Sequence, residues 1–328
     1  MTRALGLLRR RLIGVVPVFC LVVVGAFLLL EAAPGDAVDA YLAGIGGGDA
    51  AQRAALRAEW GLDQGSLARL AAYVAALLRL DLGWSTAFAR PVLSVVLERL
   101  PNTLLLMGMA TLLALSLGSA LGVVCGARPG SVRDRAVSLA AIAIYAMPGF
   151  WLGLVLIVAF SVELRWLPSG GIETVASGLT GWERALDIGR HLVLPVLALG
   201  LVYMALYLRL MRDGMAELWS QDFVRAARAR GMHGARLVLR HVARNALLPV
   251  VTMLGLQSAS MLGGSVVIES VFAIPGLGRL ASEAVARRDT PLLLGVILLS
   301  AVVVMTVNLV IDLVYALLDP RVGSGTGG

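Results

Sequence analysis

Residues 291–318 read PLLLGVILLSAVVVMTVNLVIDLVYALL, and this stretch contains a single charged side chain, that of Asp312. An apolar run of more than about 18 residues is long enough to cross the hydrocarbon core of a bilayer as a helix. A mean hydropathy of +0.86 and a hydrophobic content of 59% extend this character to the whole chain of 328 residues. The sequence therefore predicts an integral membrane protein and not a pair of soluble domains.

Five further apolar runs precede this one. The first follows three consecutive arginines and could be a signal peptide, but it is longer than the roughly 7–15 residues of a signal h-region and more apolar runs follow it. We therefore expect it to remain in the protein as the first span. The runs together predict an all-α membrane protein with six transmembrane helices, at about 12–30, 103–125, 136–160, 191–211, 249–272 and 291–318.

The arginines indicate how these spans are oriented. Sixteen of them lie in the N-terminal tail, in the second and fourth connections and in the C-terminal tail. The other connections hold twelve arginines over longer segments, where fourteen carboxylates outnumber them. Short cytoplasmic loops carry the excess of basic residues, so both termini are expected in the cytoplasm, as an even number of spans also requires.

The segment 31–101 is then extracytoplasmic. It passes a glycine run at 46–48 and enters two helix-like stretches, at about 49–60 and 64–80. The second stretch carries an apolar stripe at three- and four-residue steps. Such a helix either lies on the lipid surface or packs on the spans, and the sequence leaves both readings open. The stripe consists of Leu67, Leu70, Val74, Leu77 and Leu78.

Several classes of protein are excluded by what the chain lacks. All 28 basic residues are arginine, so no lysine is present to complete a G-x-x-x-x-G-K-[ST] nucleotide cradle. The three histidines include no i, i+4 pair, and no G-x-S-x-G or H-E-x-x-H motif occurs, which disfavours a membrane hydrolase. Cys20 and Cys125 both fall inside apolar runs and form neither a disulfide framework nor a ligand cluster.

Few polar groups lie within the predicted spans, and three of them are candidates for a functional role. Glu269 comes late in the fifth, and Asn308 and Asp312 are one helical turn apart in the sixth. Ionisable groups at membrane depth are functional candidates, as in an ion-coupled transporter. No chain of acids crosses the bilayer, so we favour a structural role in which the sixth-span pair ties helices together and Glu269 sits near the outer interface.

Small and helix-breaking residues mark further features of the spans. Pro148-Gly149 lies in the middle of the third span, where it predicts a bend. Two ridges of small residues at four-residue steps predict close helix packing, either within the chain or against a partner. They are Gly118, Gly122 and Gly126 in the second span, and Gly255, Ala259 and Gly263 in the fifth.

The connection before the fifth span is the most informative segment for function. Residues 221–249 read QDFVRAARARGMHGARLVLRHVARNALLP, which predicts a short helix ending at Gly231 and a second helix running from about Ala235 into the span. The second helix places Arg236, Arg240 and Arg244 on one face. Like charges at that spacing repel, so the row should face lipid phosphates or an acidic protein partner.

This segment resembles the cytoplasmic "EAA" loop of ABC-importer permeases, in the form found in the dipeptide/oligopeptide/nickel permease family. That loop has an A-A/A-R-A-R-G helix, a spacer, and then H-x-x-R-N-A-x-x-P. Arg225 stands where many permeases have glutamate, and the interval from Gly231 to Pro249 is longer than in the general pattern. The resemblance implies that the ATPase-coupling residues are Arg225, Ala226, Ala227, Arg228, Gly231, His241, Arg244, Asn245 and Pro249.

The resemblance extends over nearly the whole chain. The long segment after the first span is similar to that of the B-type member of a permease pair. The resemblance implies a second permease subunit, two cytoplasmic ABC ATPases that bind the ATP and magnesium, an extracytoplasmic solute-binding protein, and a bacterial inner-membrane location. The other matching motifs are Pro34-Gly35-Asp36, Gly61-Leu62-Asp63, Asp81-Leu82-Gly83, Pro148-x-Phe150-Trp151-Leu152-Gly153, Phe272-x-x-Pro275-Gly276-Leu277-Gly278 and Leu318-Asp319-Pro320-Arg321.

The sequence thus predicts a permease subunit that imports peptides or similar small solutes by alternating access and holds no ATPase site or cofactor of its own. Nickel or another small solute is the alternative substrate. A secondary transporter or a membrane-bound enzyme is the alternative class of protein. We expect the chain to divide into three parts. Residues 1–30 form the cytoplasmic tail and the first span, residues 31–101 form the extracytoplasmic cap, and residues 102–328 form the permease core, which includes the coupling loop 212–248. The expected translocation pathway includes Met147, Pro148, Gly149, Trp151 and Gln257.

Overall fold

A computed structural model describes residues 2–32, 38, 42, 47–59 and 63–318. Three of the sequence motifs fall wholly or partly outside these residues, namely Pro34-Gly35-Asp36, Gly61-Leu62 and Asp319-Pro320-Arg321. The side chain of Asp312 also lies outside the described part. Within it the chain is helical, apart from loops and one two-stranded antiparallel hairpin of β1 (Trp84–Ser85) and β2 (Arg90–Pro91).

The core of the fold is a pair of long helices, α5 (Val92–Gly126) and α8 (Gly181–Leu218), which share the most extensive contact in the molecule. Glycines on α5 allow this approach. Gly118 lies against Met204 and Tyr207, and Gly122 against Leu208 and Met211. This first small-residue ridge therefore packs within the chain. Both helices begin about ten residues before the predicted spans, at 92 in place of 103 and at 181 in place of 191.

The predicted third span is divided by a sharp bend. It forms α6 (Val132–Ala146), α7 (Gly149–Ile157) and a π-helical turn η1 (Val158–Glu163), and the second half is bent by 101° from the first. The break falls at Met147 and Pro148, which confirms the predicted bend. Met147 and Pro148 both have an extended ψ, of 134° and 132°, and Pro148 is the residue just before α7. A proline disfavours the helical conformation of the residue before it and lacks the amide hydrogen that would continue α6.

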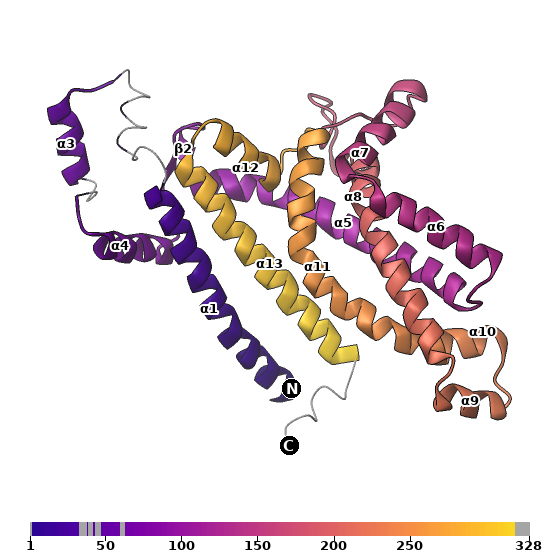
Figure 1. Cartoon of the computed structure of the whole chain (residues 1–328). Helices are drawn as coiled ribbons and strands as arrows, with labels where there is room; N and C mark the ends of the chain where they lie inside the picture. Colours follow the sequence, from indigo (N-terminus) through magenta and orange to yellow (C-terminus); the bar gives the residue numbers. More distant parts are fainter. Residues whose placement is uncertain (1, 33–37, 39–41, 43–46, 60–62, 319–328) are drawn as a thin grey trace.

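After α8 the chain forms several short helices and two long ones. The short ones are α9 (Asp222–Ala229), α10 (Gly234–Leu237) and the π-helical η2 (Val238–Ala243), and η2 continues into α11 (Arg244–Val271). A further helix, α12 (Leu277–Ala286), then precedes α13 (Thr290–Leu318). Figure 1 shows α9 and α10 at the end of the molecule that also carries the start of α1 and the end of α13.

The N-terminal elements pack on one flank of this core. Helix α1 (Thr2–Ala32) runs beside α13, and Val23, Ala26, Leu294 and Leu298 form their shared cluster (Figure 1). Helices α3 (Ala50–Glu59) and α4 (Ser66–Leu78) confirm the two predicted helical stretches of the segment after the first span.

The apolar stripe predicted for the second stretch does not act as one face. Leu77 packs on the α1–α13 cluster together with Tyr73, whereas Leu67 and Leu78 are almost fully exposed. The hydroxyl of Ser66 donates to Glu31 at 2.6 Å and fixes α4 to the end of α1. Helix α4 therefore packs on the spans by one edge, Leu70 is half-buried, and Leu67, Val74 and Leu78 stay exposed.

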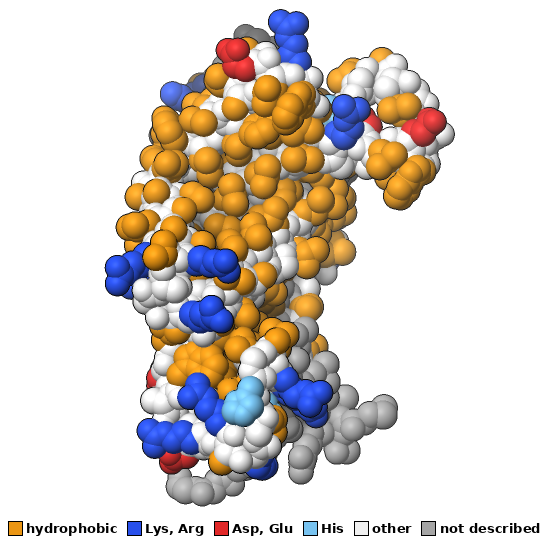
Figure 2. Space-filling view, turned by 90° about the vertical axis from the view of Figure 1, so that its right-hand side faces the viewer, with side chains coloured by type: hydrophobic (Ala, Val, Ile, Leu, Met, Phe, Trp, Pro, Cys, Tyr) orange, Lys and Arg blue, Asp and Glu red, His pale blue; other side chains and the backbone are white. Residues whose placement is uncertain are grey.

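Four helices are long and apolar enough to cross a membrane in the described part of the chain, and the bent pair α6–η1 makes a fifth. The described side chains of α1 supply a shorter apolar segment, Val16–Leu29. Six separate spans are therefore not established by helix length and composition alone. Figure 2 shows the broad band of exposed hydrophobic side chains that such a protein presents to lipid.

Candidate functional site

The coupling segment predicted from sequence contains a compact, rigid helix. Helix α9 spans eight residues, and its chain turns at Gly231, whose φ is +82°. A positive φ is strained for residues with a side chain, so glycine suits the position. The amide of Gly231 donates to the Arg228 carbonyl at 2.9 Å, and the amide of Met232 donates to the Ala227 carbonyl at 3.2 Å. The predicted helix and its glycine stop are confirmed.

One face of α9 is sealed against the rest of the chain. Val224 and Ala227 are 0% exposed and belong to a cluster with Met215, Leu237 and Val242. Ala227, one of the coupling residues that the resemblance implies, therefore offers no surface to a partner, because its methyl group fills a contact inside this chain. The sequence signal was a pair of adjacent alanines, and only the tertiary packing decides which of the two faces inward.

The opposite face of α9 is open. Ala226, Arg225 and Arg230 are exposed, and Phe223 keeps 39% of its surface. Arg225, the residue that departs from the glutamate of the general loop pattern, makes an ion pair of 3.5 Å with Asp222 one turn earlier. This face combines an aromatic ring, a small side chain and exposed cations, which is a suitable surface for another protein.

A tryptophan that sequence reasoning missed joins α9 to the core. The Nε1 of Trp219 donates to the Gly126 carbonyl at 2.7 Å, which fixes the end of α8 to the end of α5. The guanidinium of Arg228 lies 5.0 Å from the centroid of the Trp219 ring. Arg228 is thus held by a cation–π contact, and the base of α9 is tied to two of the long helices.

From Gly234 onward the chain is helical without a break, through α10 and η2 into α11. Val242 and Ala243 are buried, and the side-chain amide of Asn245 donates to the His241 carbonyl at 2.6 Å. The Nε2 of His241 is enclosed and has no hydrogen-bond partner among the described residues. Pro249 lies inside α11, and Arg236, Arg240 and Arg244 are all exposed, as the row predicted from sequence requires.

The residues predicted for the pathway are only partly brought together. Met147, Pro148 and Gly149 form the break between α6 and α7, and Trp151 follows on α7 with its ring about half exposed. Gln257 lies half-buried on α11, and no interaction recorded in the described chain joins it to the break. Their role in a pathway stays a prediction.

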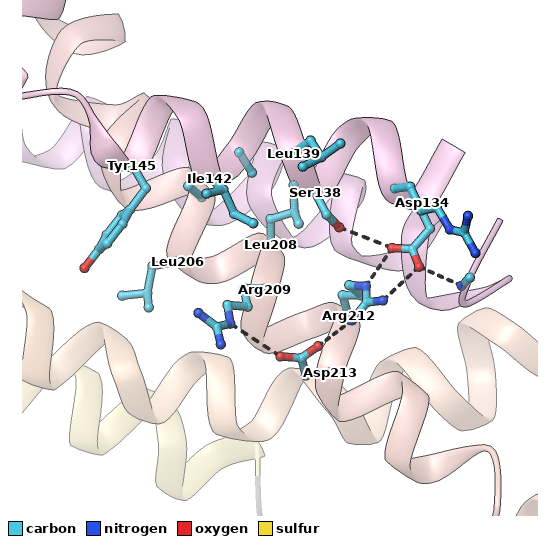
Figure 3. Close-up of a pocket in the computed structure, with 14 residues that line it drawn as sticks. Asp134, Ser138, Leu139, Ile142, Tyr145, Leu206, Leu208, Arg209, Arg212 and Asp213 are labelled. Carbon is cyan, nitrogen blue, oxygen red and sulfur yellow. Dashed lines mark hydrogen bonds and ion pairs between the residues drawn. The ribbon is translucent and has the colours of Figure 1, made fainter. Parts of the chain in front are cut away.

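A groove of about 850 Å³ lies between α6 and α8. At one end Asp134 is 1% exposed and receives two hydrogen bonds from Arg212, from Nε at 2.6 Å and from Nη2 at 2.8 Å. The amide of Gly130 also donates to Asp134, and Arg212 bonds Asp213 as well. Figure 3 shows this ionic network at one end of the groove and Tyr145 at the other.

Glu269 is the most enclosed carboxylate of the described chain. It accepts hydrogen bonds from the Thr103 hydroxyl at 2.7 Å and from the Arg279 backbone amide at 3.0 Å. Glu269 itself belongs to α11, so these bonds connect α11 to α5 and to the first turn of α12. These contacts favour a structural role for Glu269. Asn308 likewise accepts from Ser258 of α11 at 2.9 Å, which confirms the predicted hydrogen bond between neighbouring helices for that residue.

Comparison with known proteins agrees with this architecture. Residues 118–324 match the family described as binding-protein-dependent transport system inner membrane component. The oligopeptide transport system permease protein AppB of Bacillus subtilis (strain 168) is 36% identical over 315 residues, which cover 95% of this chain and 98% of that protein. The di/tripeptide transport system permease protein DppB of Pseudomonas aeruginosa (strain UCBPP-PA14) is 37% identical over 334 residues, covering 97% and 98%.

A solved structure of the MetNI methionine ABC transporter, in an inward-facing conformation, shares the fold. The TM-score is 0.56 at 17% sequence identity, and the match covers 69% of this chain and 96% of the other. The family match and the two near full-length relatives decide the classification: the chain belongs to the family of binding-protein-dependent transport system inner membrane components.

Proposed function

We propose that the chain is the B-type permease of a peptide importer, paired with a different permease subunit in the inner membrane. The observation that carries the substrate class is the similarity of 36–37%, over nearly the full length, to permeases named for oligopeptides and for di- and tripeptides. Nickel or another small solute remains the alternative substrate. A secondary transporter is the alternative class, and transport that persists without an ATPase would favour it.

The proposal includes six spans with both termini in the cytoplasm. The 31-residue α1 supplies the first span and the bent pair α6–η1 the third, and α5, α8, α11 and α13 supply the others. The arginine excess supports placing α9 in the cytoplasm. The chain then depends on partners, namely two ATPase subunits that bind ATP and magnesium and a solute-binding protein on the outer side.

Helix α9 is the proposed contact with the ATPase. Its sealed face makes it move with the core, and its open face around Phe223 and Ala226 is free to enter a groove on a partner. The bond from Trp219 to Gly126 and the continuous η2–α11 segment would pass a rigid-body displacement of α9 to α5 and α11. The break at Met147–Gly149 is the proposed flexible point of the solute pathway.

Two neighbouring alanines test this role of α9. Ala226→Trp adds bulk on the open face, so the permease should fold normally while its affinity for the ATPase falls by roughly tenfold or more. Ala227→Trp adds the same bulk inside a packed cluster and should destabilise the permease itself. Co-purification of the ATPase and ATP-driven peptide uptake in vesicles measure the first effect, and thermal unfolding of the purified permease measures the second.

The matched control is Ala286→Trp, which alters an exposed alanine at the end of α12. This variant should bind the ATPase as the unmodified permease does. Normal ATPase binding and normal uptake with Ala226→Trp would show that the open face of α9 is not the coupling surface.

A further inference from the structure

The groove between α6 and α8 changes in character along its length. Its charged end lies near the start of α6 and the end of α8, the same end of the molecule at which α9 begins. Asp134 and Tyr145, at its two ends, are eleven positions apart on α6, a distance of about 16 Å along a helix. Half of a hydrocarbon core of roughly 30 Å is about 15 Å. The groove therefore has the length of one bilayer leaflet.

Two arginine side chains at the charged end of the groove are accessible to a ligand. Asp134 and Arg212 satisfy each other in a bidentate pair, and Asp213 takes a further bond of 2.8 Å from Arg212. Arg209 reaches Asp213 only at 3.7 Å, and its side chain is 79% exposed. Arg135 is exposed and makes no ion pair with any residue that the structure describes. Both guanidinium groups can bind an anion.

The remaining length of the groove is almost wholly apolar. Leu139, Ile142 and Tyr145 on α6 are 67%, 61% and 61% exposed, and Leu206 and Leu208 form the opposite wall on α8. The only side-chain polar atom among these five residues is the Tyr145 hydroxyl. Figure 2 shows arginine side chains gathered at the lower edge of the hydrophobic band, the level at which a bilayer has its phosphates.

We propose that this groove binds one anionic phospholipid, with its phosphate on Arg135 and Arg209 and one acyl chain along Leu139, Ile142 and Tyr145. Guanidinium groups pair with phosphate oxygens through fixed, planar donors, and basic pockets between membrane helices suit anionic headgroups. The acyl chain would cover side chains that otherwise lack a partner in this chain.

Two other occupants fit the groove less well. A peptide backbone laid against the leucine walls would lose the hydrogen bonds that its amides make in water, whereas hydrocarbon loses none. A helix of the second permease subunit would cover the apolar walls but would need carboxylates at the open arginines. A ligand with an anionic head and an apolar tail matches both ends at once.

The test uses the assembled transporter in lipid nanodiscs with a photo-crosslinkable phosphatidylglycerol whose reactive group is in the middle of an acyl chain. Crosslinks mapped by mass spectrometry should concentrate on residues 139–145 and 205–208 and should exceed those from the matched phosphatidylcholine probe. The double variant Arg135→Gln/Arg209→Gln should weaken the preference for phosphatidylglycerol by roughly 30-fold, since each arginine near a membrane surface contributes about a fivefold factor.

The matched control is Arg133→Gln, which removes an exposed arginine beside the groove that does not line it. This variant should keep nearly all of the preference. Equal labelling by the two probes, or equal loss in the control, would mean that only unselective annular lipid is present and would overturn the proposal. Displacement of the crosslinks by transported peptide would assign the groove to the solute pathway, and protection that depends on the second permease would assign it to the subunit interface.

Discussion

At the scale of single residues, the carboxylate of Glu269 holds three helices together. The Thr103 hydroxyl of α5 donates to Glu269 and accepts from the amide of Leu277, which is the first residue of α12. A Cβ atom on Gly276 would collide with the carboxylate, and one on Gly278 would collide with Val266 beside it. An anion at the first turn of a helix is stabilised by the amide groups there. The Pro275-Gly276-Leu277-Gly278 motif thus has a packing reason.

Replacement of this carboxylate should destabilise the fold. Glu269→Gln keeps the size but removes the charge from its hydrogen bonds, and we expect it to lower the free energy of unfolding by about 1–3 kcal/mol. Glu98→Gln is the control, because Glu98 is exposed and pairs with Arg90 on the surface. Denaturant unfolding in detergent measures both. Equal midpoints for the two variants would contradict the structural role of Glu269.

The contrast between Ala226 and Ala227 shows what sequence could not provide at this scale. The motif around them identified the segment, but the inward residue is set by packing on Met215, Leu237 and Val242, which lie on other helices. Trp219 gave no usable signal for the same reason. Its hydrogen-bond acceptor, the Gly126 carbonyl, lies on a helix that ends 93 residues earlier in the chain.

At the scale of elements, the packing of α5 on α8 explains the first ridge of small residues. A Cβ on Gly118 would lie 2.7 Å from the Met204 carbonyl oxygen, and one on Gly122 would lie 2.8 Å from the Leu208 carbonyl oxygen. These are backbone atoms, which cannot move aside alone. The second ridge differs, because Gly255 faces Asn308 and Ile311 of α13 whereas Ala259 and Gly263 are exposed.

Two glycines on the same helix should therefore respond in opposite directions to alanine. Gly122→Ala should separate α5 from α8 and lower the free energy of unfolding by about 1–3 kcal/mol. Gly108→Ala adds a methyl group in open space and should leave stability unchanged or raise it by up to about 1 kcal/mol, since alanine favours the helix. Thermal unfolding in detergent compares them, and a loss of stability in both would indicate a general intolerance of α5.

Elements were predictable from sequence where long apolar runs mark them, and less so elsewhere. The runs indicated α5, α8, α11 and α13, and Pro148-Gly149 indicated the break in the third predicted span. Helix α12 was missed because its ten residues lie between two longer apolar runs, although Leu277, Leu280 and Ala284 repeat at helical spacing and are buried. The start of α8 was set too late because residues 181–190 carry charges that the apolar criterion rejects.

At the scale of the whole molecule, the elements sort to two opposite ends. One end carries α9, α10, the start of α1 and the end of α13, and the other carries α4, α12 and the β1–β2 hairpin (Figure 1). An even number of crossings between α1 and α13 is consistent with this arrangement. The groove, the open face of α9 and the exposed row of arginines on η2 and its neighbours all belong to the first end.

Single-cysteine labelling should place this first end in the cytoplasm. In a background with Cys20 and Cys125 replaced by alanine, Ala51→Cys on α3 and Ala229→Cys on α9 both introduce exposed thiols. A maleimide that does not cross membranes should label Ala51→Cys on intact spheroplasts and Ala229→Cys only in inverted vesicles. The physical reason is the arginine excess around α9, because segments rich in arginine are retained on the cytoplasmic side during insertion. Labelling of Ala229→Cys on intact spheroplasts would invert the topology and would remove α9 from the reach of any cytoplasmic ATPase.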